Sequence, residues 1–229
     1  GMPNFDAERR IESLQIRKRI KEIENTIYSQ RRPVEGIECV VTGTKRFPER
    51  APESGWKRFK VGDRWGGLDK ATWFRMRVTV PESMAGKTVV LLIRPRGEAL
   101  AYVNGKPAQG IDDNHNELYL TTKAKAGETF EIAFECIASA RFDEHHNFEY
   151  ADVAVLNPAV WEFYWDCQVV YEVWEILPEN YAPRMRLMML LDSVVRSVDL
   201  NIEDEPAYHD VIARAQKALK KGLKEFETS

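Results

Sequence analysis

The sequence predicts a mainly β protein with flanking helices, in which an antiparallel β-sandwich of the jelly-roll type forms the centre. Residues 72–81 and 130–136 alternate apolar and polar side chains, which is the period of a strand with one buried face. Residues 89–93 are apolar without interruption and predict a strand covered on both sides. Asn104 and Gly105 stand between two short β-like runs and predict a two-residue hairpin, because both tolerate positive φ.

The segment ahead of the sandwich, residues 6–30, predicts a helix. Its apolar residues recur mostly at steps of three or four, at Ile11, Leu14, Ile20, Ile23 and Ile27. The other positions are mostly charged, so this helix needs a partner surface to be stable: the sandwich, the later helices or another chain. Pro33 ends the helix, because proline disfavours the helical conformation in the residue before it.

Weaker signals place the remaining strands of the sandwich. These strands are expected at residues 37–42, 56–61, 118–120 and 148–155. Residues 62–70 contain three glycines and Trp65, and they predict a loop whose backbone approaches another group closely. Polar loops are expected ahead of residue 118 and over residues 140–147.

The pattern changes from the period of a strand to that of a helix after residue 156. Asn157 and Pro158 suit the N-cap and the first position of a helix that runs to about residue 177. Two more helices are expected over residues 187–198 and 204–225, the last one weakened near its end by Gly222. The chain is therefore expected to divide into an N-terminal helix (1–32), a sandwich (33–156) and a C-terminal helical segment (157–229).

Composition narrows the classes of partner. The chain has 229 residues and a formal net charge of −3, so neither nucleic acid nor a membrane surface is expected to bind it. Its three cysteines, Cys39, Cys136 and Cys167, are widely spaced and form no Cys-x-x-Cys motif, which argues against a disulfide framework or a zinc knuckle. No signal peptide and no apolar run of about 18 residues is apparent, and we expect a cytoplasmic protein.

Several short motifs follow one another in an order that resembles a known fold family. They are Trp73-Phe74-Arg75, a strand ending in Val80-Pro81, Gly86-Lys87, an apolar strand, Ala101-Tyr102-Val103-Asn104-Gly105 and Gly127-Glu128. This order resembles the galactose-binding-like jelly rolls attached to many glycoside hydrolases. The resemblance implies a galactose-binding-like sandwich between the flanking helices.

The surrounding segments make the resemblance more specific. Gly62-Asp63-Arg64-Trp65-Gly66-Gly67 precedes this order, and Gly105-Lys106-Pro107-Ala108-Gln109-Gly110 closes the hairpin within it. With the helix before and the helices after, residues 8–200 resemble the region ahead of the catalytic domain in cytosolic-type (class II) α-mannosidases, glycoside hydrolase family 38. In that family the catalytic domain follows these helices and opens with a His-x-His-x-Asp motif, whose first His and Asp bind the zinc that holds the substrate sugar.

This chain contains no His-x-His-x-Asp motif. Its histidines are His115, His145, His146 and His209. The resemblance therefore transfers no catalytic residue and no cofactor to this chain, and it places the zinc in a catalytic domain that the chain lacks. We expect the chain to be inactive alone, although its parent is expected to be an α-mannosidase.

Two polar clusters invite a metal-binding interpretation. Asp143-Glu144-His145-His146 offers carboxylates and imidazoles, but adjacent residues rarely point at one ion, and a surface loop is the simpler interpretation. The loop 112–116 offers oxygen ligands for calcium, but its spacing does not match an EF-hand. No metal site is predicted.

Sugar binding by the loops at the rim of the sandwich is a second hypothesis. Aromatic platforms and planar polar groups hold sugars, and the candidate residues are Asp63, Trp65, Trp73, Asp112, Asp113 and His115. The alternative is that Trp65 and Trp73 pack against the core or a neighbouring domain. Trp161, Trp165 and Trp174 lie on a predicted helix and are interpreted as packing residues.

Three functional hypotheses follow. The first is a non-catalytic N-terminal portion of a zinc-dependent α-mannosidase, which docks against the catalytic domain of the same polypeptide and adds homo-oligomer contacts through its helices. The second is a stand-alone carbohydrate-binding module that recognises a mannose-containing glycan. The third, a complete small enzyme, is disfavoured because no active site assembles. If a partner domain is missing, apolar surface should be exposed on the C-terminal helices.

Overall fold

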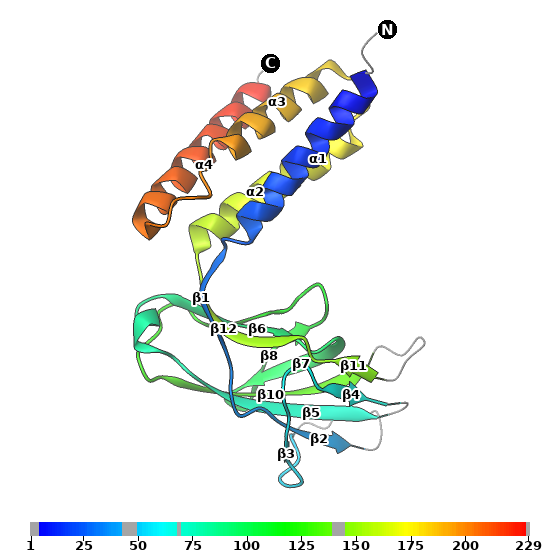
Figure 1. Ribbon diagram of the computed structural model, residues 1–229, viewed down its shortest axis with the longest axis vertical. Coiled ribbons are helices and arrows are strands. Elements are labelled where there is room, and N and C mark those ends of the chain that lie inside the picture. Colours follow the sequence, from blue (N-terminus) through cyan, green and yellow to red (C-terminus); the bar gives the residue numbers. More distant parts are fainter. Residues whose placement is uncertain (1–4, 43–49, 68–69, 139–144, 228–229) are drawn as a thin grey trace. The chain divides into compact units, whose positions relative to one another are not determined.

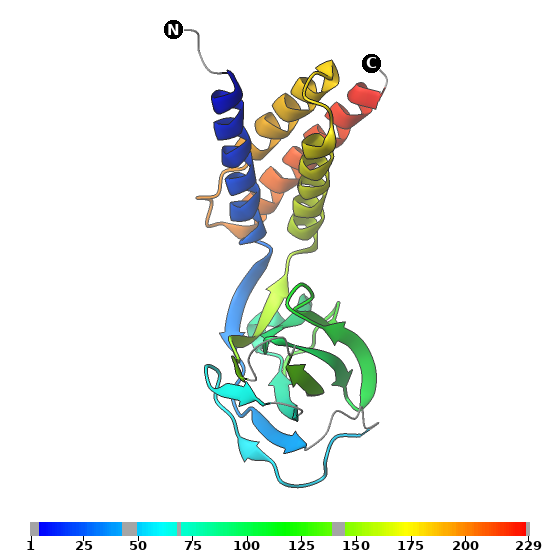
Figure 2. The same ribbon diagram turned by 90° about the vertical axis from the view of Figure 1, so that its right-hand side faces the viewer.

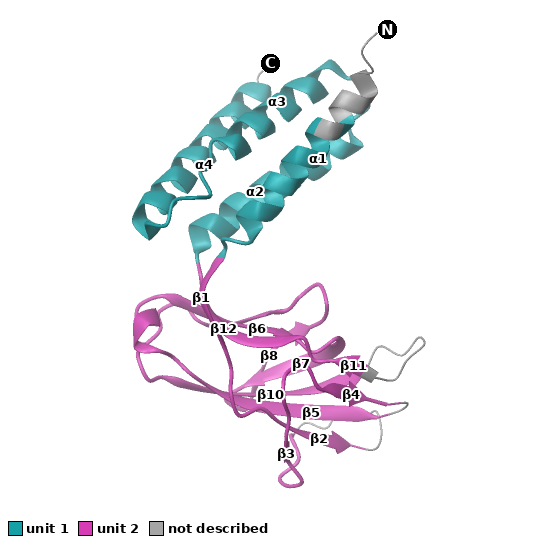
Figure 3. Cartoon of the chain, viewed as in Figure 1, with its two compact units in different colours: residues 1–27, 157–229 teal, residues 28–156 magenta. Residues whose placement is uncertain are grey.

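The computed structural model describes residues 5–42, 50–67, 70–138 and 145–227. Clustering of its contacts divides the chain into two compact units (Figure 3). Unit 1 combines residues 1–27 with residues 157–229, and unit 2 consists of residues 28–156. The two ends of the chain therefore contribute to one helical unit, and the sandwich is inserted between them in the sequence.

Unit 2 is a β-sandwich, as predicted (Figure 1). Its strands are β1 (Tyr28–Pro33), β2 (Glu38–Thr42), β3 (Lys57–Arg58), β4 (Arg64–Gly66), β5 (Ala71–Thr79), β6 (Thr88–Arg94), β7 (Gly97–Val103), β8 (Lys106–Ile111), β9 (Glu117–Thr121), β10 (Thr129–Ala138), β11 (His145–Asn147) and β12 (Tyr150–Leu156). A short 3₁₀ helix, η1 (Glu82–Met84), follows β5. One sheet has the strand order β1-β12-β6-β9, the second has β3-β2-β5-β10-β7-β8, and β11 pairs with β4 in a small third sheet.

The alternating strands bury the face that the sequence predicts. Phe74, Met76 and Val78 of β5 lie in the core with Phe130 and Phe134 of β10, and these two strands pair antiparallel. Residues 89–93 are all buried, which confirms a strand covered on both sides. The mainly β fold class is thus confirmed.

Aromatic rings fill the centre of the sandwich. The Phe74 ring makes edge contacts with Phe59 (centroid distance 5.0 Å), Trp65 (5.6 Å) and Phe148 (5.1 Å), and it packs against Phe134 (5.4 Å). These partners come from four separate segments of unit 2, so Phe74 joins parts of the core that are far apart in the sequence.

The predicted hairpin is confirmed at Asn104 and Gly105. Both adopt positive φ, +50° and +79°, and they connect β7 to the antiparallel strand β8. Two predicted loops are corrected: residues 64–66 and 145–147 are short strands, which pair with each other as β4 and β11. The paired residues lie 79 to 83 positions apart in the sequence, so local sequence carries no signal for this ladder.

Within its described residues, unit 1 contains four helices that pack along one another (Figure 2). They are α1 (Phe5–Glu24), α2 (Pro158–Ile176), α3 (Ala182–Arg196) and α4 (Glu205–Glu227). Gly222 of α4 lies against Leu190 of α3, where a Cβ at residue 222 would fall 2.3 Å from Leu190 Cδ1. This glycine therefore permits a close approach of the two helices rather than only weakening the end of α4.

The first helix is shorter than predicted. It ends at Glu24 rather than at residue 30, and Tyr28–Pro33 forms β1 at the edge of the four-stranded sheet, paired with β12. The Thr26 hydroxyl donates to the Ile23 carbonyl at 2.7 Å and satisfies one acceptor at the helix end. Strand pairing, a long-range interaction, overrides the local helical periodicity of residues 25–30. Among the described residues, no helix is long and apolar enough to cross a membrane.

Candidate functional site

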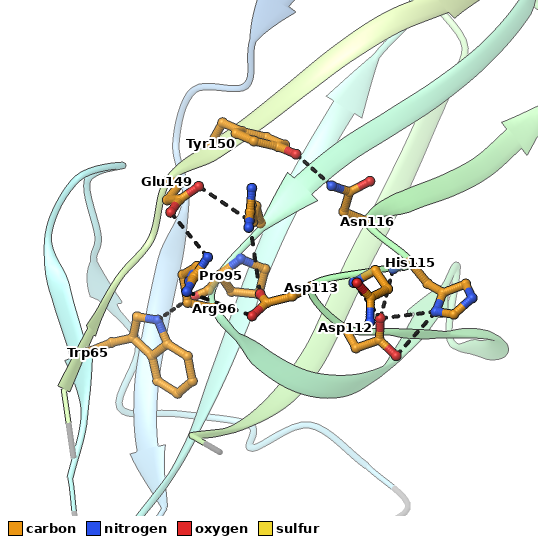
Figure 4. Close-up of polar contacts among 11 residues, drawn as sticks. Trp65, Pro95, Arg96, Asp112, Asp113, His115, Asn116, Glu149 and Tyr150 are labelled. Atoms are coloured by element: carbon orange, nitrogen blue, oxygen red, sulfur yellow. Dashed lines mark hydrogen bonds and ion pairs between the residues drawn. The ribbon is translucent and has the colours of Figure 1, made fainter. Parts of the chain in front are cut away.

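Four charged side chains form a cluster on the sandwich, which we call the rim (Figure 4). They are Arg94, Arg96, Asp113 and Glu149. Arg94 ends β6 and Arg96 lies in the connection to β7. Arg94 Nε lies 3.3 Å from Glu149 Oε2 and 4.0 Å from Asp113 Oδ1. Arg96 lies 3.9 Å from Asp113 Oδ2 through Nη2 and 3.6 Å from Glu149 Oε1 through Nη1. These long, partly exposed ion pairs contribute little stability, so the cluster is primarily a feature of surface chemistry.

The Trp65 side chain supports the backbone between Arg94 and Arg96. Its indole Nε1 donates a buried hydrogen bond to the Pro95 carbonyl at 2.6 Å. Arg96, the next residue, has φ of +75°, which is strained for a residue with a side chain. At Gly97 a Cβ would lie 2.7 Å from both the Ile137 carbonyl oxygen and Trp65 Cη2, so only glycine fits. Residues 95–97 are thus held in one conformation that presents Arg96.

The substitution Trp65→Phe is expected to destabilise unit 2 by about 1–3 kcal/mol, because it leaves the buried Pro95 carbonyl without its donor. Trp56→Phe is the matched control, since Trp56 Nε1 also donates to a proline carbonyl, that of Pro52, at 2.9 Å in a less buried place. Urea denaturation should show a clearly smaller loss of stability for the control. Equal losses for the two variants would contradict the role assigned to Trp65.

The loop after β8 is built on Asp112. Its Oδ1 accepts hydrogen bonds from the backbone N–H groups of Asn114 (2.8 Å) and His115 (2.7 Å), and His115 Nδ1 lies 3.0 Å away. Desolvation favours the neutral acid and is the largest single effect, but the hydrogen bonds from His115 and from the two backbone groups together outweigh it, so the pKa of Asp112 lies below its ordinary value.

Because the folded pKa of Asp112 is lowered, its carboxylate contributes stability that is present above the unfolded pKa and is lost as the pH falls through the folded pKa. Asp112→Asn should therefore be less stable than the wild type at neutral pH, and the difference should vanish in acid. Denaturation curves recorded at several pH values measure this difference. A difference that persists unchanged in acid would contradict the role of the carboxylate.

A polar hollow lies beside the rim. It has a volume of about 440 Å³ and is lined by Arg64, Arg96, His146, Asn147 and Glu149. The antiparallel pairing of β4 with β11 brings Arg64 opposite Asn147 and Trp65 opposite His146. Nearby, Asn116 Nδ2 donates to the Tyr150 hydroxyl at 2.7 Å.

The structure places the predicted sugar-binding residues in two regions. Asp113 and Trp65 both belong to the rim, one as an ion-pair partner and the other as its buried support. Asp112 and His115 form the adjoining loop. Asp63 is exposed just before β4, where its carboxylate accepts the Lys60 N–H at 3.1 Å.

Trp73 lies elsewhere, on the outer face of the six-stranded sheet. Trp73 is 1% exposed and Trp65 is 5% exposed, so the packing alternative holds for both indoles. Sugar binding at the rim stays a prediction.

Sequence reasoning missed Arg94, Arg96, Glu149 and Tyr150. The signal that could have found the first two is Arg94-Pro95-Arg96-Gly97, two arginines around a proline directly after a buried strand. Glu149 and Tyr150 reach the same rim only because β12 pairs with β6, with Tyr150 opposite Arg94.

We searched the described part of the chain for a metal-binding cluster and for a nucleophilic cysteine. Within it, no group of three or more His, Cys, Asp or Glu side chains is placed to hold an ion. Asp143 and Glu144, the two acidic residues of the cluster 143–146, lie outside the described residues. All three cysteines are free thiols. Burial raises the pKa of the Cys167 thiol to about 12, which suits a buried apolar residue and not a nucleophile.

Unit 1 carries an exposed apolar stripe along α2. It consists of Trp161 (37% exposed), Trp165 (45%), Val169 (53%), Val173 (42%) and Ile176 (82%). These residues recur at steps of three or four on the side of α2 opposite to its buried residues, such as Phe163, Cys167 and Trp174. This arrangement matches the expectation of exposed apolar surface on the C-terminal helices. Trp161 and Trp165 pack against each other, with ring centroids 6.2 Å apart, while part of each ring stays exposed. Trp174 is buried as expected.

The family model and the curated relatives agree on one family. The family model described as "Alpha-mannosidase, jelly roll domain" matches residues 32–169. Among curated proteins, the chain is similar to alpha-mannosidase G of Dictyostelium discoideum, with 24% identity over 180 residues, which are 71% of this chain and 16% of that protein. It is also similar to human alpha-mannosidase 2C1, with 30% identity over 100 residues, or 41% of this chain and 10% of that protein.

The chain thus spans about a sixth or less of the length of these relatives. Among solved structures, a Bacteroides uniformis beta-glucuronidase covers 55% of this chain and 18% of its own, with a TM-score of 0.42 and 13% identity. A putative beta-galactosidase from Bacteroides fragilis gives the same TM-score with 19% identity, over 55% of this chain and 23% of its own.

Proposed function

Because this chain belongs to the family of α-mannosidase jelly roll domains, we propose that it is the non-catalytic N-terminal portion of a zinc-dependent α-mannosidase and that it supports the enzyme by docking. The family match carries this proposal, since it runs from β1 through the whole sandwich into α2. Catalysis by such an enzyme would use residues outside this segment.

The α2 stripe is the surface best suited to docking. Five apolar side chains on one helix face, two of them tryptophans, form a patch that is unusual on a domain that works alone. Tryptophan is also among the residues that contribute most energy to protein interfaces. Trp161, Trp165 and Val169 lie inside the segment that matches the family. We assign the catalytic portion of the polypeptide as the occupant of this stripe, and a second copy of the chain as the competing occupant.

Glycoside hydrolysis needs two carboxyl groups placed on either side of the scissile bond. At the rim, the carboxylates of Asp113 and Glu149 are both shared between Arg94 and Arg96. In this proposal the zinc, which would orient the substrate sugar, belongs to the catalytic portion. The compartment is cytoplasmic, in keeping with the three free thiols.

Calorimetric titration of this chain into the catalytic portion of the same α-mannosidase, expressed without the segment, tests the proposal. We expect saturable binding with a negative heat-capacity change, because apolar surface is buried. An absence of binding by two properly folded partners would overturn the docking role.

Glycan binding at the rim is the second candidate function. It is favoured by the polar hollow, whose planar side chains Arg96, Asn147 and Glu149 are of the type that bonds sugar hydroxyls. Titration of the chain with mannose and manno-oligosaccharides tests it directly. Millimolar or tighter binding that is lost in Arg96→Ala would support it, and an absence of heat would count against it.

A further inference from the structure

A second hollow lies on the outer face of the six-stranded sheet. Along β5, Phe74 and Met76 point into the sandwich core, so the alternating residues Trp73 and Arg75 belong to the opposite face. This hollow has a volume of about 260 Å³, and its lining includes Arg50, Trp73, Arg75, Tyr102, Glu131 and Ala133. None of them belongs to the rim.

The hollow exists because Ala133 is small. Ala133 of β10 lies directly opposite Arg75 of β5 on one side and Tyr102 of β7 on the other. Cross-strand neighbours on one face stand close together, so a methyl group between two long side chains leaves a gap. Trp73 and Tyr102, with ring centroids 6.1 Å apart and planes tilted by 35°, both line this gap.

Two planar charged groups line the same hollow, and each is held by a partner. Arg75 Nε donates to Glu38 Oε1 at 3.0 Å, and its guanidinium stacks 4.2 Å from the Trp56 ring. Glu131 forms an ion pair with Arg77 through Oε1. Within the described residues no further partner is assigned to the Arg75 Nη groups or to Glu131 Oε2. A fork of donors and a carboxylate oxygen are therefore fixed in place and available.

Buried polar atoms without a hydrogen-bond partner lie on and beside Trp73. Trp73 Nε1 is buried and has no hydrogen-bond partner in the described part of the chain. The same holds for both carboxylate oxygens of Glu135, which is 5% exposed and lies opposite Trp73 on the neighbouring strand. Burial raises the pKa of Glu135, and the nearby Trp73 indole opposes this only in part, without reaching hydrogen-bond geometry. Unpaired buried polar groups are rare and costly, so they call for an explanation.

We propose that the hollow on the outer face of the six-stranded sheet binds a single pyranose ring of a neutral glycan. A pyranose has an apolar face of C–H groups, which suits the partly exposed Tyr102 ring, and hydroxyls that both donate and accept. Arg75 offers donors and Glu131 offers an acceptor, so hydroxyls satisfy both. The lining carries charges of both signs, Arg50 and Arg75 with Glu131, which matches a ligand that offers both donors and acceptors.

The proposal is independent of the docking role and of the rim. Docking uses the α2 stripe in unit 1, whereas this hollow is built entirely by unit 2. Failure of sugar binding here would leave docking untouched, and failure of docking would leave this site untouched.

The test is a titration of the ¹⁵N-labelled chain, followed by two-dimensional NMR, with the methyl α-glycosides of mannose, glucose and galactose as probes. We expect saturable shifts with a millimolar dissociation constant for at least one probe, centred on Gly105, Ala133 and the Trp73 indole N–H. Ala133→Leu fills the hollow without removing any polar group and should weaken binding at least tenfold.

Two further variants keep the test independent of folding defects. Glu131→Gln changes an exposed side chain and should also weaken binding at least tenfold, because a neutral amide oxygen accepts a hydrogen bond more weakly than a carboxylate does. Leu100→Ala is the control: Leu100 is 40% exposed on the same face of the same strand as Tyr102, two residues away and outside the lining, and its binding should match the wild type. An absence of saturable shifts with every probe, shifts confined to the rim, or unchanged binding in both Ala133→Leu and Glu131→Gln would overturn the proposal.

Discussion

Replacing Trp161 and Trp165 together by glutamate is expected to weaken the binding of this chain to the catalytic portion of the α-mannosidase at least about a hundredfold. Each tryptophan at the centre of an interface commonly contributes about 2 kcal/mol or more, and about 1.4 kcal/mol corresponds to a factor of ten in the dissociation constant. The two rings lie one turn apart on α2, with centroids 6.2 Å apart, so they would act as one anchor. Calorimetry with the two separately expressed portions measures the effect.

The double variant should keep the fold of unit 1, because both rings are substantially exposed and the core of the bundle is formed by the opposite face of α2. Val41→Glu provides the control, since Val41 is 56% exposed and belongs to the sandwich. Its binding should equal that of the wild type. An unchanged dissociation constant in the double variant would remove the α2 stripe as the docking surface.

Replacing Phe74 by alanine is expected to destabilise the sandwich by about 3–5 kcal/mol, the usual cost of removing a buried phenylalanine ring. Phe74 is fully buried and touches Phe59, Trp65, Phe134 and Phe148. Since a domain is commonly stable by only about 5–15 kcal/mol, unit 2 should lose a large part of its stability. Thermal or urea denaturation, followed by the near-ultraviolet signal of the aromatic residues, measures the loss.

The same substitution should also loosen the rim, because the Trp65 ring that rests on Phe74 holds the Pro95 carbonyl. Tyr119→Ala is the control, as Tyr119 is 48% exposed on β9, and surface substitutions of this kind usually cost less than about 0.5 kcal/mol. A loss of stability in Phe74→Ala as small as that of the control would show that the ring is not central to the core.

Much of the fold could be predicted because its signals are local. The alternation in β5 and β10, the apolar run 89–93 and the pair Asn104-Gly105 each specify an element within ten residues of sequence. The end of α1 and the pairing of β4 with β11 could not be predicted in the same way. In both cases the decisive hydrogen bonds join segments that are far apart in the sequence.

The candidate sites show the same limit. Tryptophan is equally suited to a sugar platform and to a core, and the sequence does not say which: the structure buries Trp65 and Trp73, yet exposes Trp161 and Trp165. Polar clusters depend on which strands become neighbours, so Arg94 and Glu149 meet only through the pairing of β6 with β12. The periodicity of apolar residues identifies the faces of a helix or strand. Which residues those faces contact depends on the pairing of segments that are far apart in the sequence.

Release of nitrophenol from a chromogenic α-mannoside by the purified 229-residue chain is the most direct test of its accessory role. We predict a rate equal to that of buffer alone at every pH and with added zinc, because the proposed role places the active site in another part of the polypeptide. Turnover that co-purifies with the chain and survives removal of contaminating glycosidases would contradict this role and show that the described units contain a complete active site.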